Sequence, residues 1–444
     1  MGDNIDKEER DEIVDPKLYE PVLYKKRWLM LLLFASVSML NAFQWIHLNI
    51  VADSVIYFWN GSLPADPYQQ DLSIAWLSMI YMLSYIPLII PATWLLDRYG
   101  LRVSIVLGAI LNTLGAWLKC VSVQLSEPVG VSTTAAFSSF PILMLAQTVC
   151  SISQVSLLGM PAQLAVTWFG QNELPLATAI GVFGNQVGVA LGFGIPPLIV
   201  PSLESFTTAN STQQADDMFA DFKRGFQYLL YGGAIIITVD LLLILIFFRN
   251  QPKQAPSRAQ YARLTRLKQQ KAGAAQFVSN GDADRERSEN DLSRSSSPVS
   301  SHSTDSITTV FGPENGGYKA TFVKLLKNYC FDLLNICYGV NTGVYHTIST
   351  LLSVILLAHY PQDQVAIGWI GFTMVIAGLI GSIVAGVVLE RTGRYRRVLI
   401  IFYVLSVVSF GFYVGSIYTC QIGVIFFAMF LLGFFSIWIP AIRI

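Results

Sequence analysis

Polar side chains suited to binding interrupt an apolar segment near the start of the chain. The stretch NAFQWIHLNI, which begins at Asn41, sets amides, an imidazole and an indole among aliphatic residues. Polar groups inside a bilayer are costly and usually face a protein interior or a water-filled cavity. On a helix, Asn41, Trp45 and Asn49 share one face. Gln44 and His47 share a neighbouring face, so this side of the helix is not suited to lipid.

Two later apolar segments carry similar polar groups. Asn185 and Gln186 lie at the middle of one, and the segment 329–358 contains Asn341, Thr342, Tyr345, His346, Ser349 and Thr350. In a transporter built from two halves, such stretches converge near the bilayer midplane. The predicted binding residues are therefore Asn41, Trp45, Asn185, Gln186, Tyr345 and His346.

The chemistry of these side chains is aromatic and neutral. Such a cavity suits a quaternary ammonium ion, which each ring attracts by ~0.5–2 kcal/mol through cation–π contact. It suits a flat hydrophobic ligand nearly as well, and the alternative for Trp45 is plain helix packing. His47 and His346 could ligate haem or sense pH, although lone intramembrane histidines more often act as hydrogen-bonding residues. For Asp240 a paired or protonated carboxylate is favoured over proton coupling.

Composition identifies the elements that position these residues. The chain is 53% hydrophobic and 13% charged, against about 25% charged in soluble domains, which excludes a soluble enzyme. Apolar blocks of about 20 residues predict membrane-spanning helices. Ten such blocks occur, at 28–51, 74–96, 101–121, 140–163, 174–200, 226–248, 329–358, 366–389, 397–417 and 421–440. We predict an all-α integral membrane protein with no enzyme activity, no cofactor, no metal site and no nucleic-acid partner.

Basic residues predict the orientation and the domain organisation. They cluster before the first segment and in alternate loops, which places the N-terminus in the cytoplasm. The sequons at Asn60 and Asn210 then fall outside, as glycosylation requires. We expect a cytoplasmic tail at 1–27, a six-helix bundle at 28–249, a disordered Ser-rich linker at 250–320 and a four-helix partial bundle at 321–444.

An acidic-Arg-x-Gly motif recurs at matching positions of the two halves. It occurs in LLDRYGLR at 95–102 and in VLERTGRYRR at 388–397. Repeated six-helix halves are characteristic of major facilitator transporters, and the glycine permits a tight turn. We expect the motif to latch one conformation of an alternating-access cycle through Asp97, Arg98, Gly100, Arg102, Glu390, Arg391 and Gly393.

A glycine stripe predicts close helix packing in the fifth segment. Gly184, Gly188 and Gly192 are four residues apart and share one helix face. Small residues at this spacing let helix backbones approach each other closely.

Several of these stretches resemble the feline leukaemia virus subgroup C receptor family, also called solute carrier family 49. The resemblance rests on NAFQWI, WLSMIYMLSYIPLIIPATWLLDRYGLR, LGAWLKCVSVQ, GNQVGVALGFGIPPLIVP and TGVYHTISTLL, and extends over most of 25–250 and 320–435. It implies a twelve-helix facilitator that carries choline and ethanolamine across the plasma membrane, with haem as the alternative cargo. It also implies substrate contacts at Trp45 and Gln186. The family's tyrosine in the seventh helix falls on His346, so the neighbouring Tyr345 is expected to supply the ring.

The C-terminal stretch SIWIPAIRI departs from the family's pattern. From it we expect a truncated form whose second half has two helices fewer than the family's. This favours a third hypothesis, a non-transporting receptor or regulatory form that associates with a full-length partner.

Overall fold

The computed structural model describes residues 20–127, 134–203, 212–252, 254–262, 265, 327–360, 363–419 and 421–436. The chain divides into two compact units. The first comprises Met1–Tyr24, Val166–Asn172 and Gln251–Ile336, and most of its residues lie outside the described ranges. The second comprises Lys25–Ala165, Glu173–Asn250 and Cys337–Ile444 and contains nearly all of the helices.

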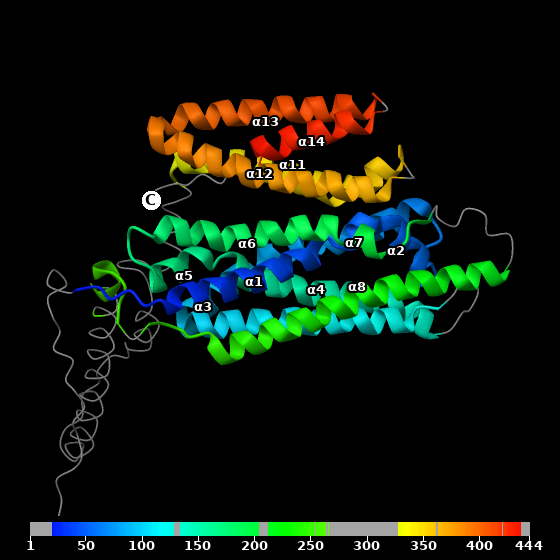
Figure 1. Ribbon diagram of the computed structural model, residues 1–444, viewed down its shortest axis with the longest axis horizontal. Coiled ribbons are helices and arrows are strands. Elements are labelled where there is room, and N and C mark those ends of the chain that lie inside the picture. The colour runs from blue at the N-terminus through cyan, green and yellow to red at the C-terminus, as the bar shows by residue number, and fades with distance from the viewer. Residues whose placement is uncertain are drawn as a thin grey trace, which may run out of the picture. The chain divides into compact units, whose positions relative to one another are not determined.

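Every regular element in the described part of the chain is a helix, so the predicted all-α class is confirmed (Figure 1). The N-terminal half contains α1 (Lys26–Ile46), η1 (Asn49–Val51), α2 (Ala52–Phe58), η2 (Asn60–Ser62), α3 (Pro67–Leu125), α4 (Thr134–Leu158), α5 (Pro161–Trp168), α6 (Leu174–Gly194), α7 (Pro196–Ile199) and α8 (Thr212–Phe247). The C-terminal half contains α11 (Tyr329–Leu357), α12 (Gln364–Thr392), α13 (Tyr395–Ile417) and α14 (Ile422–Ser436).

Within the described ranges, eight helices are long and apolar enough to cross a membrane, and α14 is a shorter apolar helix. The helix α3 accounts for two of the ten predicted segments. Its 59 residues would span about 90 Å as one rod, against a hydrocarbon core of about 30 Å. The backbone leaves helical geometry at Gly100, where φ is 81° and ψ is −179°. The segments 74–96 and 101–121 are therefore the two parts of α3 on either side of this turn.

The helix α6 packs closely against α1 in the N-terminal half. A Cβ atom added at Gly184 would lie 2.7 Å from the carbonyl oxygen of Ala35, and one at Gly192 would lie 2.5 Å from Cγ2 of Ile46. At Gly188 it would overlap the backbone of Met39. The three glycines thus lie where α6 leaves no room for a side chain against α1. Beyond them, Gly194 ends α6 and the two prolines that follow begin the short helix α7.

Glycines also bring helices together in the C-terminal half and between the halves. Gly381 of α12 lies against Phe434, and Gly433 of α14 lies against Met374 of α12. Between the halves, a Cβ at Gly368 of α12 would lie 2.8 Å from the carbonyl oxygen of Phe193 in α6. Figure 1 shows α12 running next to α6 and α7.

Candidate functional site

Two amides, Asn41 of α1 and Asn49 of η1, are buried and hydrogen-bonded to neighbouring helices of the N-terminal half. Asn41 Nδ2 donates to Asn112 Oδ1 of α3 at 3.0 Å and to the carbonyl of Cys150 in α4 at 3.1 Å. Asn49 Nδ2 donates to the carbonyl of Ile74 in α3 at 3.0 Å. The amide donors of these two residues are therefore engaged in packing within the half.

Gln44, in the last turn of α1, and His47, its C-cap residue, form a second buried group. Gln44 Oε1 accepts a hydrogen bond of 2.6 Å from Lys119 Nζ of α3. His47 Nδ1 lies 3.1 Å from the carbonyl oxygen of Gln44, and its ring stacks on Phe43 with centroids 5.2 Å apart. The sequence reading did not include Lys119 in this group. A lone lysine in an apolar segment is the signal that could have identified it.

Trp45 contacts the C-terminal half. It is 2% exposed, and its Nε1 donates to the carbonyl of Ser78 at 3.2 Å. Its ring meets that of His346 edge-on, with centroids 5.1 Å apart and an interplanar angle of 85°. The rings of Tyr345 and His346 are 5.6 Å apart. The structure thus brings together three of the predicted residues, one from α1 and two from α11.

Four polar atoms among the predicted binding residues are buried without a hydrogen-bond partner in the described part of the chain. They are Oδ1 of Asn41, Oε1 of Gln186, the hydroxyl oxygen of Tyr345 and Nδ1 of His346. Buried polar groups are normally hydrogen-bonded, so atoms of this kind are candidates to bind a ligand. The neighbouring Asn185 differs, because its Nδ2 donates to Ser38 Oγ at 3.4 Å. The Nδ2 atoms of Asn41 and Asn185 therefore already have side-chain partners. Among the described residues, Asn41 Oδ1, Gln186 Oε1, the Tyr345 hydroxyl and His346 Nδ1 have none.

The mid-helix acid of α8 is hydrogen-bonded to α1. Asp240 is 7% exposed, and its Oδ1 accepts a hydrogen bond of 2.6 Å from Ser36 Oγ. The same half contains an ion pair of 3.0 Å between Arg27, at the start of α1, and Glu173, which precedes α6.

The first copy of the repeated motif forms the turn inside α3. Arg102 donates from its backbone N–H to Asn250 Oδ1 and from its side chain to the carbonyl of Leu245, both at 3.3 Å. Leu245 lies in the last turn of α8, where a cation is favourable because helix carbonyls point outward. Arg98 lies 5.2 Å from the ring centroid of Trp94, and Asp97 takes part in an interaction as well. The two hydrogen bonds of Arg102 hold the turn of α3 against the end of α8 and the Asn250 that follows it.

The second copy of the acidic-Arg-x-Gly motif lies at the C-terminal end of α12. Gly393 is the C-terminal cap, with φ 59°, and its N–H donates to the carbonyl of Leu389. Arg391 lies in the last turn and is exposed. The side chain of Glu390 lies outside the described residues. Each copy thus places its glycine where the backbone takes a positive φ angle.

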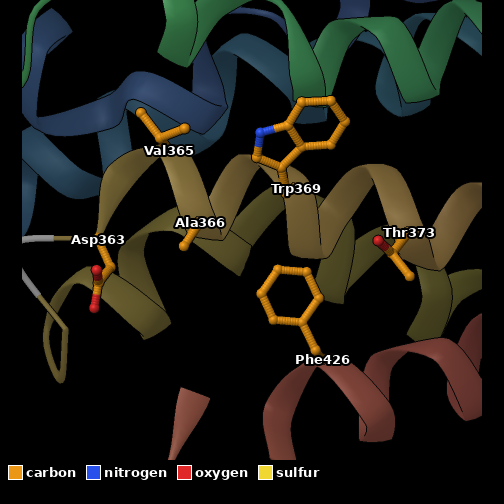
Figure 2. Close-up of a pocket in the computed structure, with 6 residues that line it drawn as sticks. All are labelled: Asp363, Val365, Ala366, Trp369, Thr373 and Phe426. Atoms are coloured by element: carbon orange, nitrogen blue, oxygen red, sulfur yellow. The ribbon is translucent and has the colours of Figure 1, made fainter. Parts of the chain in front are cut away.

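A separate cavity of about 600 Å³ lies along α12. It is lined by Asp363, Val365, Ala366, Trp369, Thr373 and Phe426. Figure 2 shows the indole of Trp369 and the ring of Phe426 on opposite sides of the α12 ribbon. These two rings do not form a box around a cation, and none of the predicted binding residues lines this cavity.

The glycosylation candidates differ in what the structure describes. Asn60 is exposed in η2, and its side-chain oxygen accepts a hydrogen bond of 3.3 Å from Gln70. Asn210 lies outside the described residues, as do most of the linker predicted at 250–320 and the C-terminal stretch from 437 onward. In the described ranges, no group of three or more His, Cys, Asp or Glu side chains could hold a metal ion.

Comparison with known proteins agrees with this architecture. The Major Facilitator Superfamily profile matches residues 30–443. The chain is 36% identical over 413 residues to the "Choline/ethanolamine transporter flvcr2a" of Danio rerio, covering 93% of this chain and 71% of that protein. It is 32% identical over 411 residues to the human "Choline/ethanolamine transporter FLVCR2", covering 93% of this chain and 63% of that protein.

Solved structures show the same fold. A bacterial homologue of the human lysosomal transporter Spinster matches with a TM-score of 0.59 at 14% identity, covering 94% of this chain and 74% of that one. The xylose transporter XylE of E. coli matches with a TM-score of 0.58 at 11% identity, covering 93% and 85%. The sequence relatives that this chain matches are longer, and it spans between 58% and 71% of their lengths.

Proposed function

The chain belongs to the major facilitator superfamily and, within it, to the feline leukaemia virus subgroup C receptor family of membrane transporters, and on this premise we propose that it carries choline and ethanolamine across the plasma membrane. The relatives' names supply the substrate class. The single structural observation that supports it is the ring contact between the two halves, in which Trp45 meets His346 and His346 packs against Tyr345.

These residues fit the chemistry of a small organic cation. Aromatic rings attract a quaternary ammonium group through their negative faces. The free Oε1 of Gln186 can accept a hydrogen bond from the hydroxyl of choline or from the ammonium of ethanolamine. The rings pack edge-on against each other in this structure, so a bound cation must take the place of part of that contact.

The arrangement of the halves supports alternating access. One contact between the halves joins the end of α6 to the start of α12, at Phe193 and Gly368. A second joins η1 to α11, where Ser353 Oγ donates to the carbonyl of Ile50 at 2.9 Å. Gly393 lies at the opposite end of α12 from this α6–α12 contact, and Gly100 forms the turn inside α3. If the basic turns face the cytoplasm, as positive charge favours, the α6–α12 contact closes the outer side of the site.

Substitution of Trp45 tests the proposal through uptake of radiolabelled choline at equal surface expression. Trp45→Ala is expected to abolish saturable uptake, whereas Trp45→Phe keeps part of it because phenylalanine retains a weaker π face. Trp117→Ala is the control, since this indole is 41% exposed on α3. Equal loss in both Trp45 variants would contradict the cation–π role. Haem efflux that disappears in His346→Ala, without choline flux, would contradict the proposed substrate.

A further inference from the structure

The end of α1 lies one residue beyond Trp45 and is buried inside the N-terminal half. The helix stops at Ile46, and the chain continues through η1 from Asn49. Carbonyl groups in the last turn of a helix have no partner within it, and in a membrane they need one from elsewhere in the protein. Here that partner comes from α3 and α4.

Side chains of four residues converge on the carbonyls of Gln44 and Trp45, and one of them is His47, whose Nδ1 lies 3.1 Å from the Gln44 carbonyl oxygen. Lys119 Nζ donates to the Gln44 carbonyl at 3.3 Å, and Gln147 Nε2 donates to the same oxygen at 3.1 Å. Gln147 Nε2 also lies 3.4 Å from the Trp45 carbonyl, to which Ser78 Oγ donates at the same distance. Since Trp45 Nε1 donates to the Ser78 carbonyl at 3.2 Å, both the backbone and the ring of Trp45 are held.

The side chains that donate to these carbonyls cap the end of α1, and Lys119 is the charged residue among them. Its side chain is 0% exposed, and it forms no ion pair with a carboxylate in the described part of the chain. A buried charge without partners is strongly unfavourable. The carbonyl and amide oxygens of Gln44 stabilise the ammonium, and the negative end of the α1 dipole adds to this stabilisation.

We propose that Lys119 is a positioning residue for substrate binding, which caps the buried end of α1 and thereby sets the place of Trp45 against His346. The expected effect on choline binding rests on the proposed function. The effect of Lys119 on the position of Trp45 does not depend on which substrate is carried. Gln147 assists Lys119 by donating to the same carbonyl oxygen.

The first test measures Trp45 directly and needs no substrate. The whole chain is labelled with 5-fluorotryptophan in lipid nanodiscs, and the ¹⁹F resonance of Trp45 is identified by its absence in Trp45→Phe. Lys119→Met, which keeps the length but removes the donors, is expected to shift this resonance. Gln147→Met should shift the Trp45 resonance in the same direction. This variant replaces Lys119→Met in the test if Lys119→Met does not fold. Ser122→Ala is the control, because it removes another buried bond of α3, the one of 2.8 Å to Trp59 Nε1.

The second test links position to binding. Lys119→Met is expected to weaken choline binding about tenfold, the scale of one charge-assisted hydrogen bond. If Lys119 acts through Trp45, the double variant with Trp45→Phe binds no more weakly than the weaker single variant. Losses that multiply in the double variant would overturn the proposal, as would an unmoved Trp45 resonance in both cap variants. If the wild-type chain binds no choline while the Trp45 resonance still shifts in Lys119→Met and Gln147→Met, the proposed substrate is refuted and the positioning role is supported.

Discussion

At the scale of single residues, Asp240 illustrates how an acidic side chain is accommodated in an apolar helix. Its carboxylate accepts a hydrogen bond from Ser36 of the neighbouring helix α1. We predict that Asp240→Asn leaves choline uptake within about threefold of wild type, because the amide oxygen can accept the same bond and one such bond contributes only about 1 kcal/mol. Uptake is measured at several external pH values. Loss of uptake, or of a pH dependence present in the wild type, would instead assign Asp240 to proton coupling.

Residue types indicate a chemistry for the proposed site, but they do not predict which residues lie next to each side chain. Helical periodicity shows which residues share a face of α1, and this is local information. The partners of Asn41 and Gln44 are Asn112 and Lys119, each more than 70 residues away. Such partners follow from the packing of α3 and α4 against α1, which no single segment encodes. The sequence therefore indicated a polar interior but could not separate hydrogen bonds within a half from a ligand site.

At the scale of helices, the contact of α6 with α1 depends on the absence of a side chain at Gly188. An added methyl group would overlap the backbone of Met39, and overpacking a tight contact costs typically 1–3 kcal/mol or more. We predict that Gly188→Ala lowers the thermal unfolding midpoint of the purified protein. Gly232→Ala in α8 is the matched control, since a Cβ there meets nothing within 4 Å. A similar change in both variants would show that the predicted glycine stripe is not needed for packing.

The two motif glycines allow a second comparison between elements. Gly100 combines φ 81° with ψ −179°, a region open almost only to glycine, and a Cβ would lie 2.6 Å from Asn250 Oδ1. Gly393 has φ 59° and ψ 7° at a helix end, with open space around it, a conformation that asparagine tolerates. Gly100→Asn is expected to reduce the yield of folded protein sharply, while the yield of Gly393→Asn stays near that of the wild type. Size-exclusion chromatography measures both yields. Equal yields would argue against strain at the α3 turn.

Helix positions were the most predictable level of the structure. Length and hydropathy are local properties, and the ten apolar segments correspond to the described helices once α3 is divided at Gly100. The extension of α3 to Pro67 and of α8 to Thr212 was not predicted. Polar and charged residues fill those ends, so hydropathy alone stops short of them. Helix capping and packing, rather than burial in lipid, stabilise the added turns at the N-terminal ends of these helices.

At the scale of the whole molecule, the two halves meet where α12 crosses the end of α6. A Cβ at Gly371 would lie 2.6 Å from Cγ of Phe193 and 3.0 Å from Leu352 Cδ2 of α11. A larger side chain at this position obstructs the contact between the halves at Phe193 and Leu352. Population of the closed arrangement should therefore fall while the N-terminal half stays folded.

Gly371→Val is expected to lower the maximal rate of choline uptake and to expose the contact between the halves. The reporter is Ser353→Cys on α11, a position that is 1% exposed and bonded to Ile50 of η1. A membrane-impermeant maleimide applied outside the cell should label this cysteine faster in the Gly371→Val background. Gly386→Val on the same helix is the control, because a Cβ there meets nothing within 4 Å. Unchanged labelling together with unchanged uptake would show that the α6–α12 contact does not close the transport path.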